Sequence, residues 1–352
     1  LLLGFAIAFN FSSCSDDEYT DKYPDPSETS TTSCEKLMTG MFYQGRDYTF
    51  NTYWRMWTWE NYMMAIYAQT RGFLLTPEST YGYSDSYAED RWENFYDVLT
   101  QYRVLMHTYE NLDEAEKSTY TIFTLLSEIY LYDHLSQVID AFGDVPFTEA
   151  GYLAITGDVA SSYPSYDKAS DLYSMMLDRL KEINTQVQSM DGNLSSLTNS
   201  YLNAQDFINK GNLTKWRKYC NSLRLRLAIR VASSSELGSQ GQAAIKEIID
   251  GNLPLVDAIA DNIQVLPDRD GFNYSDQFIT GFGDGTHARA SQAMLDVLNT
   301  ESTLGENDSR LAVMYAKNGA GIYRGMSTSE TYVEQQTNTT GPNANIIYSR
   351  ID

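Results

Sequence analysis

Aromatic side chains crowd one early stretch of the chain and offer a way to hold flat, weakly polar ligands. Between positions 43 and 109 the sequence carries eleven of its 27 Tyr and four of its five Trp. Sugar rings present apolar C–H faces that stack on aromatic rings, while Asn, Asp and Arg read their hydroxyls. The candidate ligand contacts in this stretch are Trp54, Trp57, Trp59, Tyr62, Arg71, Tyr81 and Tyr83.

Two of these tyrosines fall in a segment that reads as an exposed loop. Residues 76–90 lack helical periodicity and carry Pro77, Gly82 and many polar groups. Such segments run over the surface, where binding residues gather. We therefore expect Tyr81 and Tyr83 to be better ligand contacts than an aromatic residue within a helix.

The tryptophans are less clearly exposed, because their spacing also suits helix faces. Trp92 shares helical spacing with Tyr96 and Leu99, which favours core packing for all three. Trp54 and Trp57 are also spaced for one helix face. For these two, core packing and ligand contact are equal alternatives.

A second candidate strip lies further along the chain. Asn273 and Tyr274 place an amide beside an aromatic ring, a pairing that also suits a sugar. The glycine-rich run at 281–285 is no dinucleotide fingerprint, because no strand precedes it and no acidic partner is evident. Asp268 and Asp270 form only part of a calcium loop, so we expect no metal here.

The sequence shows few residues in patterns typical of enzyme catalysis. The three histidines, His107, His134 and His287, show no close metal-ligand spacing, and neither a G-x-S-x-G elbow nor a P-loop occurs. A glycoside hydrolase needs only two carboxylates, so the 47 acidic residues leave that alternative open. A second alternative is an interaction protein that scaffolds a surface complex. We expect no enzyme and no cofactor.

The overall charge restricts the partners. The chain has 25 basic and 47 acidic residues, a net charge of −22. Such a surface repels phosphate backbones and anionic lipid headgroups, which argues against nucleic acid and against electrostatic membrane docking. Any membrane attachment must then be covalent or hydrophobic. The 352 residues, 42% hydrophobic, suffice for one large domain or two small ones.

The first residues resemble the targeting segment of a bacterial lipoprotein. Residues 1–13 begin with an apolar run too short to span a bilayer and end in two serines. Cys14 follows directly, as in a lipobox, so we expect residues 1–13 to be part of a signal peptide and Cys14 to be lipidated. Residues 14–34 are rich in Asp, Glu, Ser and Thr, which predicts a flexible acidic tether. The acidic run after Cys14 also resembles a surface-export signal of Bacteroidetes.

The two other cysteines do not make a disulfide framework. Cys34 lies at the end of the tether, and Cys220 lies in a strongly helical segment. We expect Cys220 to be a buried, small apolar residue, although an exported chain could pair the two.

Helical spacing governs most of the remaining chain. Apolar residues recur at three- and four-residue steps over 120–139, 167–187, 216–231, 242–250 and from 291 to 298. Alternating strand patterns are scarce. We therefore expect a mainly α fold of helical hairpins with long irregular loops, in one domain over residues 35–352.

Three ordered blocks carry motifs that are more specific than composition. Residues 142–150 read FGDVPFTEA, and residues 164–167 read PSYD. Residues 206–230 contain GNLTKW followed by NSLRLRLAIR, and residues 289–325 carry R-x-S, NDSRL and Y-x-G. Together the blocks resemble the SusD/RagB family of outer-membrane lipoproteins. The departures in the second block are Asn209, Asn212, Tyr219 and Cys220.

Most residues in these blocks have a structural explanation. Gly143 and Pro146 end a helix, and Asp167 is placed to cap the next one. We expect Trp216 to anchor the core. The residues that we expect to pair with carboxylates inside the fold are Arg224, Arg226 and Arg230.

The family resemblance implies a function. It implies a tetratricopeptide-like α-helical scaffold, anchored by lipid to the outer membrane and facing the cell exterior. There it would bind oligosaccharide and deliver it to a SusC-like TonB-dependent transporter. A peptide-binding RagB-type uptake protein is the alternative, and a surface glycoside hydrolase is a weaker one. Family chains usually continue well past this length, so we expect the C-terminal part to be missing.

Overall fold

The computed structural model of the chain describes residues 32–49, 53–72, 85–263, 289–299, 308–343 and 346–351. Helices account for most of these residues, and the sheet formed among them has two short strands. The fold is therefore mainly α, as the helical spacing of the sequence predicts.

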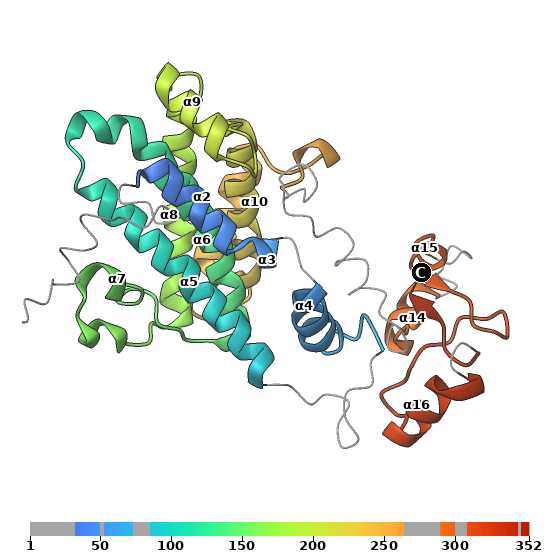
Figure 1. Cartoon of the computed structure of the whole chain (residues 1–352). Coiled ribbons are helices and arrows are strands. Elements are labelled where there is room, and N and C mark those ends of the chain that lie inside the picture. The colour runs from blue at the N-terminus through green and yellow to red at the C-terminus, as the bar shows by residue number, and fades with distance from the viewer. Residues whose placement is uncertain are drawn as a thin grey trace, which may run out of the picture.

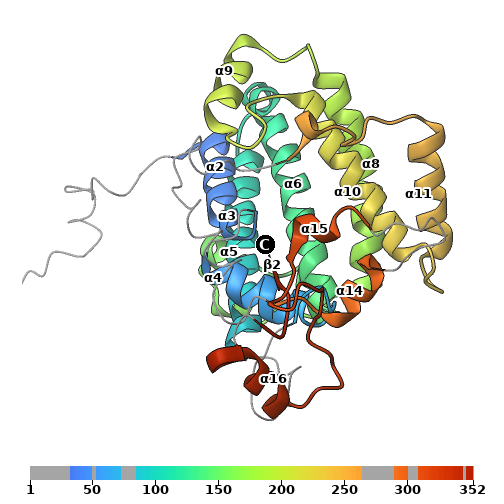
Figure 2. The same cartoon turned by 90° about the vertical axis from the view of Figure 1, so that its right-hand side faces the viewer.

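The longer helices form an array of packed pairs. They are α2 (Cys34–Gln44), α5 (Asp85–Glu110), α6 (Glu114–Phe142), α8 (Ala169–Met190), α9 (Ser196–Gln205), α10 (Leu213–Val231) and α11 (Gly238–Asp250). Helix α5 packs on α6 and α10 packs on α11, each with its neighbour in sequence, while α2 covers α5 and α6 (Figure 1). Turned by 90°, the array shows α8, α10 and α11 side by side on one flank of α6 (Figure 2). The helical hairpins expected from the sequence are thus present.

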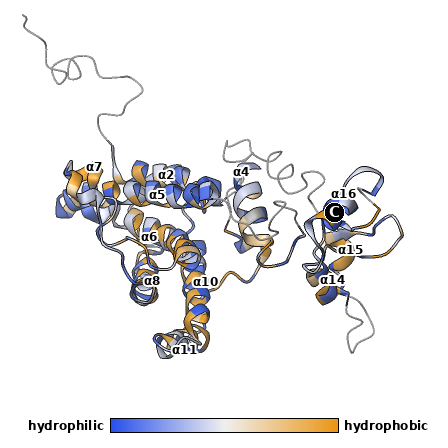
Figure 3. Cartoon of the chain, turned by 90° about the horizontal axis from the view of Figure 1, so that it is seen from below, coloured by the Kyte–Doolittle hydropathy of each residue, from blue (hydrophilic) through white to orange (hydrophobic). Residues whose placement is uncertain are grey.

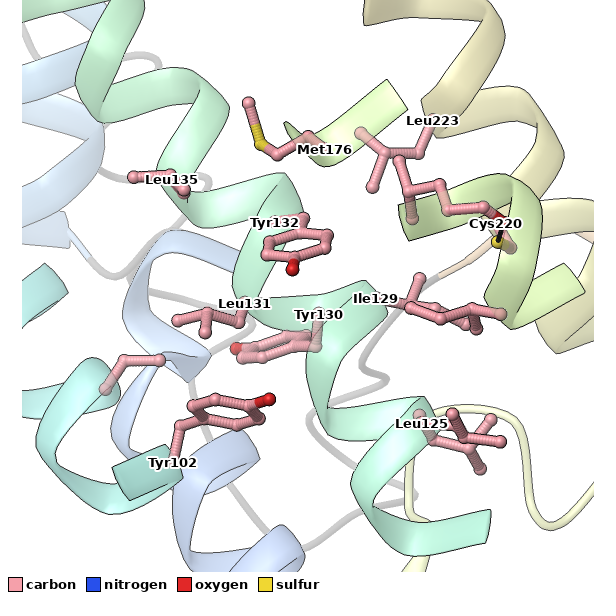
Figure 4. Close-up of a cluster of buried hydrophobic side chains, with 14 of the residues drawn as sticks. Tyr102, Leu125, Ile129, Tyr130, Leu131, Tyr132, Leu135, Met176, Cys220 and Leu223 are labelled. Carbon is pink, nitrogen blue, oxygen red and sulfur yellow. Dashed lines mark hydrogen bonds between the residues drawn. The ribbon is translucent and has the colours of Figure 1, made fainter. Parts of the chain in front are cut away.

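Helix α6 lies at the centre of this array and is buried on nearly all sides. Residues 122–132 are buried without interruption, as expected for a helix with neighbours around it. Figure 4 shows its side chains between Tyr102 of α5 and the side chains Met176 of α8 and Cys220 of α10. A capping box formed by Asp113 and Glu116 starts the helix. The helix therefore begins earlier than its apolar pattern.

Trp216 anchors the core, as predicted. Its side chain is fully buried, and its indole Nε1–H donates to the carboxylate of Asp206 at 2.7 Å. The same carboxylate accepts three backbone amides of the turn that follows it. The ring of Phe42 from α2 stacks on the indole with centroids 5.7 Å apart. The start of the 206–230 block therefore forms a hydrogen-bonded structural unit that joins α2 to α10.

The arginines of α10 pair with carboxylates of neighbouring helices, but only Arg224 does so inside the fold as predicted, because the side chains of Arg226 and Arg230 are exposed. The pairs are Arg224 with Glu247 (3.1 Å), Arg226 with Asp133, and Arg230 with Asp140 (3.1 Å). Because Asp133 and Asp140 belong to α6 and Glu247 to α11, these pairs tie α10 to both neighbours. They are structural groups and leave ligand binding to other residues.

Two aspartates, one at each end of the segment between α6 and α8, hold this segment by accepting backbone amides near the other aspartate. The prediction that Asp167 caps the next helix is wrong, because Lys168 is the N-cap residue of α8. The carboxylate of Asp144 instead accepts the first helical amide, that of Ala169, at 2.8 Å. Asp167 accepts two backbone amides of the FGDVPFTEA segment at 2.8 and 2.9 Å. We call this reciprocal pairing of Asp144 and Asp167 the aspartate clasp.

Shorter elements connect and follow the array. Before α8 they are α3 (Arg46–Thr49), α4 (Tyr53–Arg55), the π-helix η1 (Met56–Ala65), α7 (Leu153–Thr156) and the 3-10 turn η2 (Val159–Ser162), and η3 (Ile259–Asp261) follows α11. The C-terminal elements are α14 (Gln292–Leu298), α15 (Leu311–Met314), β1 (Tyr315–Ala316), α16 (Tyr332–Thr339), η5 (Gly341–Asn343) and β2 (Arg350–Ile351). Strands β1 and β2 pair antiparallel.

The C-terminal elements form a small unit that contacts the segment after η1. The amide of Gly72 donates to the carbonyl of Arg289 at 2.9 Å, which joins the two segments (Figure 1). Inside the unit, Gly325 lies against the backbone of Gln292, where an added Cβ would come within 2.3 Å of an amide nitrogen. This close approach explains the glycine of the Y-x-G motif.

Both described cysteines are buried and unpaired. Burial raises the pKa of the Cys34 thiol to about 11 and that of the Cys220 thiol to about 12. The prediction that Cys220 is a buried, apolar-like residue is confirmed, and the two do not pair.

Hydrophilic and hydrophobic residues both occur along the long helices (Figure 3). Within the described ranges, none combines the length and apolar run that crossing a bilayer requires.

Candidate functional site

The π-helix η1 carries three of the nine predicted ligand contacts, Trp57, Trp59 and Tyr62, and a charged pair fixes it to the array. Arg55, just before η1, pairs with Asp90 of α5. The same carboxylate accepts the hydroxyl of Tyr48 at 2.9 Å. A π-helix is uncommon and is frequently found at functional sites. Its wider turn also changes which side chains share a face, so spacing rules for an α-helix do not apply here.

The structure separates the three tryptophans of this segment. Trp59 is buried between Tyr48 and Phe142, with centroids 6.2 and 6.4 Å away. Trp57 is half-buried and has a parallel neighbour in the ring of Tyr53, 6.3 Å away. Trp54 is 48% exposed and meets Tyr87 edge-on. Trp59 is therefore a core residue, whereas Trp54 and Trp57 present ring area at the surface.

Arg71 lines a hollow between η1 and the C-terminal unit, which we call the η1 hollow. Its volume is about 380 Å³, within the range of small-molecule sites. Its polar groups include Arg71, Asn61 and Glu60, and the guanidinium of Arg71 donates to the amide oxygen of Asn61. The opposite wall includes Met314 and Tyr315.

The walls of the η1 hollow come from distant parts of the sequence. The hydroxyl of Tyr315 donates to the carbonyl of Thr70 at 3.0 Å, and these residues are 245 positions apart. Asn61 is 2% exposed and Arg71 is 4% exposed, so their polar atoms are positioned by the fold. A buried amide and guanidinium beside apolar walls can read ligand hydroxyls or a carboxylate.

The hollow has few side chains that could act as a general acid or base. Among the described residues that line it, Glu60 is the one carboxylate, whereas glycoside hydrolysis uses a pair of carboxylates across the scissile bond. No group of three or more His, Cys, Asp or Glu suited to a metal occurs in the part of the chain that the structure describes. The arrangement therefore supports binding and offers no evident catalytic pair.

Several predicted contacts lie outside the described residues. Tyr62 lies in η1, but its side chain is not among those described. The predicted residues outside the described ranges are Cys14, Tyr81, Tyr83, Asn273 and Tyr274, together with the partial calcium motif at Asp268 and Asp270. Their roles remain predictions.

A second concave surface, which we call the α5–α7 groove, was missed by the sequence interpretation. It lies between α5 and the segment around α7, has a volume of about 600 Å³ and is lined by Trp92, Tyr96, Tyr163 and Tyr166 among others. Trp92 was expected in the core. It does pack against the core, but it is half-buried and also lines the groove. The missed signal was two tyrosines near prolines in a non-helical segment, which indicates exposure.

The two described histidines, His107 and His134, lie away from the hollow and the groove. His134 is fully buried in α6 beside the ring of Tyr130, 4.5 Å away. Burial, aided by the nearby positive charge of Arg91, lowers the pKa of His134 to about 3. His107 lies near the end of α5 and bonds to Asn111. Neither of these two lines the hollow or the groove.

Comparisons with known proteins identify the family. The family model SusD-like, described as "Starch-binding associating with outer membrane", matches residues 26–349. A comparison with curated proteins gives no match.

Solved structures show the same fold. A chitin-binding SusD homologue from Flavobacterium johnsoniae has a TM-score of 0.65 at 17% identity, covering 89% of this chain and 60% of its own. SusD homologues from Bacteroides thetaiotaomicron and Bacteroides ovatus have TM-scores of 0.61 and 0.60 at 17% and 21% identity. They cover 92% and 85% of this chain, and 60% and 59% of their own lengths. The chain therefore spans about 60% of the length of these structures.

Proposed function

The chain belongs to the SusD-like family, and from this premise we propose that it is a cell-surface lipoprotein that binds oligosaccharide and delivers it to a SusC-like TonB-dependent transporter. The ligand class follows from the starch-binding description of the family and from the chitin-binding homologue. The transporter partner follows from the family resemblance of the three sequence blocks.

The observation that carries the binding proposal is the η1 hollow. It places Arg71, Asn61 and Glu60 beside apolar walls in a volume of about 380 Å³. Oligosaccharides combine hydroxyls with apolar ring faces, so a site of this composition suits them. Trp54, exposed on the neighbouring α4, adds an aromatic surface close to η1.

The proposed anchor is the lipidated Cys14. Because the chain carries a net charge of −22, electrostatic attachment to anionic lipid is unfavourable. Several acyl chains on one cysteine would instead contribute about 0.8 kcal/mol for each buried CH₂. Mass spectrometry of the processed protein should find Cys14 acylated at its N-terminus. Finding an unmodified Cys14 would remove the anchor from the proposal.

Binding at the hollow is tested by changing its polar groups. We expect Arg71→Lys to weaken binding of a neutral hexasaccharide about tenfold or more, because a lysine cannot reproduce the planar donor geometry. Isothermal titration calorimetry with malto-, cello- and chito-hexaose measures the effect. Tyr67→Ala is the matched control, because Tyr67 is 49% exposed near η1 but does not line the hollow.

Two outcomes would contradict the proposal. Wild-type protein that binds none of the oligosaccharides but binds short peptides would favour the RagB-type alternative. Release of reducing ends from a polysaccharide, abolished by Glu60→Gln, would favour a glycoside hydrolase. Equal affinity of wild type and Arg71→Lys, with normal circular dichroism for both, would exclude the η1 hollow as the binding site.

A further inference from the structure

The α5–α7 groove is hollowed on a different side of the helix array from the η1 hollow. The two share no lining residue. The groove runs between Trp92, Tyr96 and Thr100 of α5 and the chain from Pro146 to Tyr166. With a volume of about 600 Å³, it lies well within the range of small-molecule sites.

The far wall of the groove is a loop, but its backbone is fixed at several points. The aspartate clasp joins the two ends of the segment to each other at the start of α8. Glu149 accepts the amide of Ser165 at 3.0 Å, which draws the two limbs of the loop together. Arg103 of α5 donates to the carbonyls of Phe147 and Ala150 at 2.6 and 3.1 Å. The groove is therefore a built surface whose shape does not depend on a ligand.

Aromatic rings form the inner face of the groove and are held by the core. Trp92 meets Phe142 edge-on at 5.2 Å and Tyr96 at 4.9 Å. The hydroxyl of Tyr96 donates to the carbonyl of Pro146 at 2.8 Å, which fixes that ring across the groove. Tyr166 lies 6.5 Å from Trp92 with the two rings tilted by 31°. The rings thus present fixed apolar faces to the open side.

The outer face of the groove carries hydroxyls without partners. Tyr163 is 81% exposed and Tyr166 is 66% exposed. Neither phenolic hydroxyl has a hydrogen-bond partner within the described residues, and the same is true of the side-chain hydroxyls of Thr100 and Ser162, which also line the groove. These groups can both donate and accept hydrogen bonds. They are matched to a ligand that carries many hydroxyls.

Charge is absent from this surface. The described residues that line the groove include no Asp, Glu, Lys or Arg, although the chain as a whole has a net charge of −22. A charged ligand would find no counter-ion there, and an anionic one would be repelled by the rest of the surface. Ring faces together with hydroxyls and without charge favour a neutral sugar over an ionic ligand.

We propose that the α5–α7 groove is a second binding site for neutral oligosaccharide, in which Tyr166 and Trp92 stack on sugar rings and the free hydroxyls of Tyr163, Thr100 and Ser162 bind the sugar hydroxyls. The choice of ligand class rests on the proposed function, but the site does not use the η1 hollow. The row of rings formed by Trp59, Phe142 and Trp92 links the η1 segment to the groove through the core.

The test removes the two exposed rings. Titration calorimetry of the full chain with malto-, cello-, xylo- and chito-hexaose is compared for wild type and the double variant Tyr163→Ala/Tyr166→Ala. We expect the double variant to lose one of two binding events, or about tenfold in affinity, for the oligosaccharide that the wild type binds. The double variant Tyr163→Phe/Tyr166→Phe keeps the rings and should lose less.

Two controls separate the groove from the fold and from the η1 hollow. Val159→Ala lies in the same segment, is 65% exposed and does not line the groove, so its affinity should equal that of wild type. Arg71→Lys changes only the hollow, and it should keep the binding event that the tyrosine variant loses.

Each other outcome overturns the groove proposal. If Tyr163→Ala/Tyr166→Ala binds like wild type while Arg71→Lys is weakened, the proposed function stands and the groove is not a site. If the tyrosine variant loses affinity only for a neutral hexapeptide tested in parallel, the ligand class is wrong. If the wild type binds no oligosaccharide, both the groove and the proposed function fail.

Discussion

Tyrosines of the helical core and tyrosines of the α5–α7 groove carry the same hydroxyl but have different partners. In the core, the hydroxyl of Tyr132 donates to Glu128 at 2.7 Å and that of Tyr219 donates to Asp133. In the groove, the hydroxyls of Tyr163 and Tyr166 have no partner within the described ranges. The hydroxyls of these two core tyrosines therefore bond within the fold, whereas those of Tyr163 and Tyr166 stay available to a ligand.

This difference gives a way to recognise a binding surface in a chain rich in aromatics. An aromatic residue whose polar atom bonds to a neighbour contributes to the fold, because breaking that bond leaves a buried group unsatisfied. Where the ring packs but the hydroxyl has no protein partner, replacing the residue should lower the free energy of unfolding only slightly. Substitutions in the two regions should therefore separate effects on stability from effects on binding.

The largest effect on stability is expected at Trp216. Trp216→Ala removes a fully buried ring and a bond to Asp206, so it should lower the free energy of unfolding by about 3–5 kcal/mol. Urea unfolding followed by circular dichroism measures the change. Trp54→Ala, at a site 48% exposed, should lower it by less than about 1 kcal/mol. Equal losses would mean that exposure does not distinguish the two tryptophans.

A smaller effect is expected where one hydroxyl is removed from each region. Tyr219→Phe should cost about 1.5–3 kcal/mol, because it takes a donor from the ionised Asp133. Tyr163→Phe should change the free energy of unfolding by less than about 0.5 kcal/mol, since its hydroxyl has no partner in the described structure. The same urea experiment measures both. A costly Tyr163→Phe would show that the groove tyrosine is structural.

The smallest effect concerns pH and should arise in the core. Burial lowers the pKa of His134 to about 3, below its ordinary value of 6.5. Below pH 6.5, His134 binds a proton in the unfolded chain but stays neutral in the folded chain. The free energy of unfolding is therefore highest above pH 6.5 and falls as the pH drops below it. Between pH 7 and 5.5 the loss should be about 1.3 kcal/mol.

A variant identifies the source of this pH dependence. His134→Phe keeps a ring beside Tyr130 and cannot be protonated, so its stability should change less between pH 7 and 5.5. Urea midpoints at the two pH values provide the measurement. Oligosaccharide affinity at the groove should stay constant over this range, because the described residues that line it include no His, Asp or Glu. An unchanged pH slope in His134→Phe would assign the effect to other groups.

Helices were predictable from sequence to different degrees along their length. The pattern at 120–139 marks α6, but the helix starts at Glu114 because an exposed capping box precedes the apolar residues. Likewise α11 starts at Gly238, before the apolar pattern that begins near 242. Apolar spacing reports only the part of a helix that is buried, so polar ends are missed.

The candidate sites were predictable only in part. Arg71 was identified and lines the η1 hollow, but Trp59 proved to be a core residue. Helical spacing was read only for Trp54 and Trp57, and the segment that carries Trp57 and Trp59 forms a π-helix. The groove was missed because its two sides, α5 and the chain that follows Pro146, meet only in the fold: the hydroxyl of Tyr96 donates to the carbonyl of Pro146, 50 residues away.

The sequence by itself determined the helical fold class, the family, the anchoring of Trp216 and the pairing of the α10 arginines with carboxylates. These depend on local periodicity and on ordered motifs that are visible in one dimension. The tertiary structure decided which aromatic residues face solvent and which groups meet across the hollow and the groove. The reason is physical: exposure and hydrogen-bond partners depend on segments as far apart as Thr70 and Tyr315, whose contact no local pattern encodes.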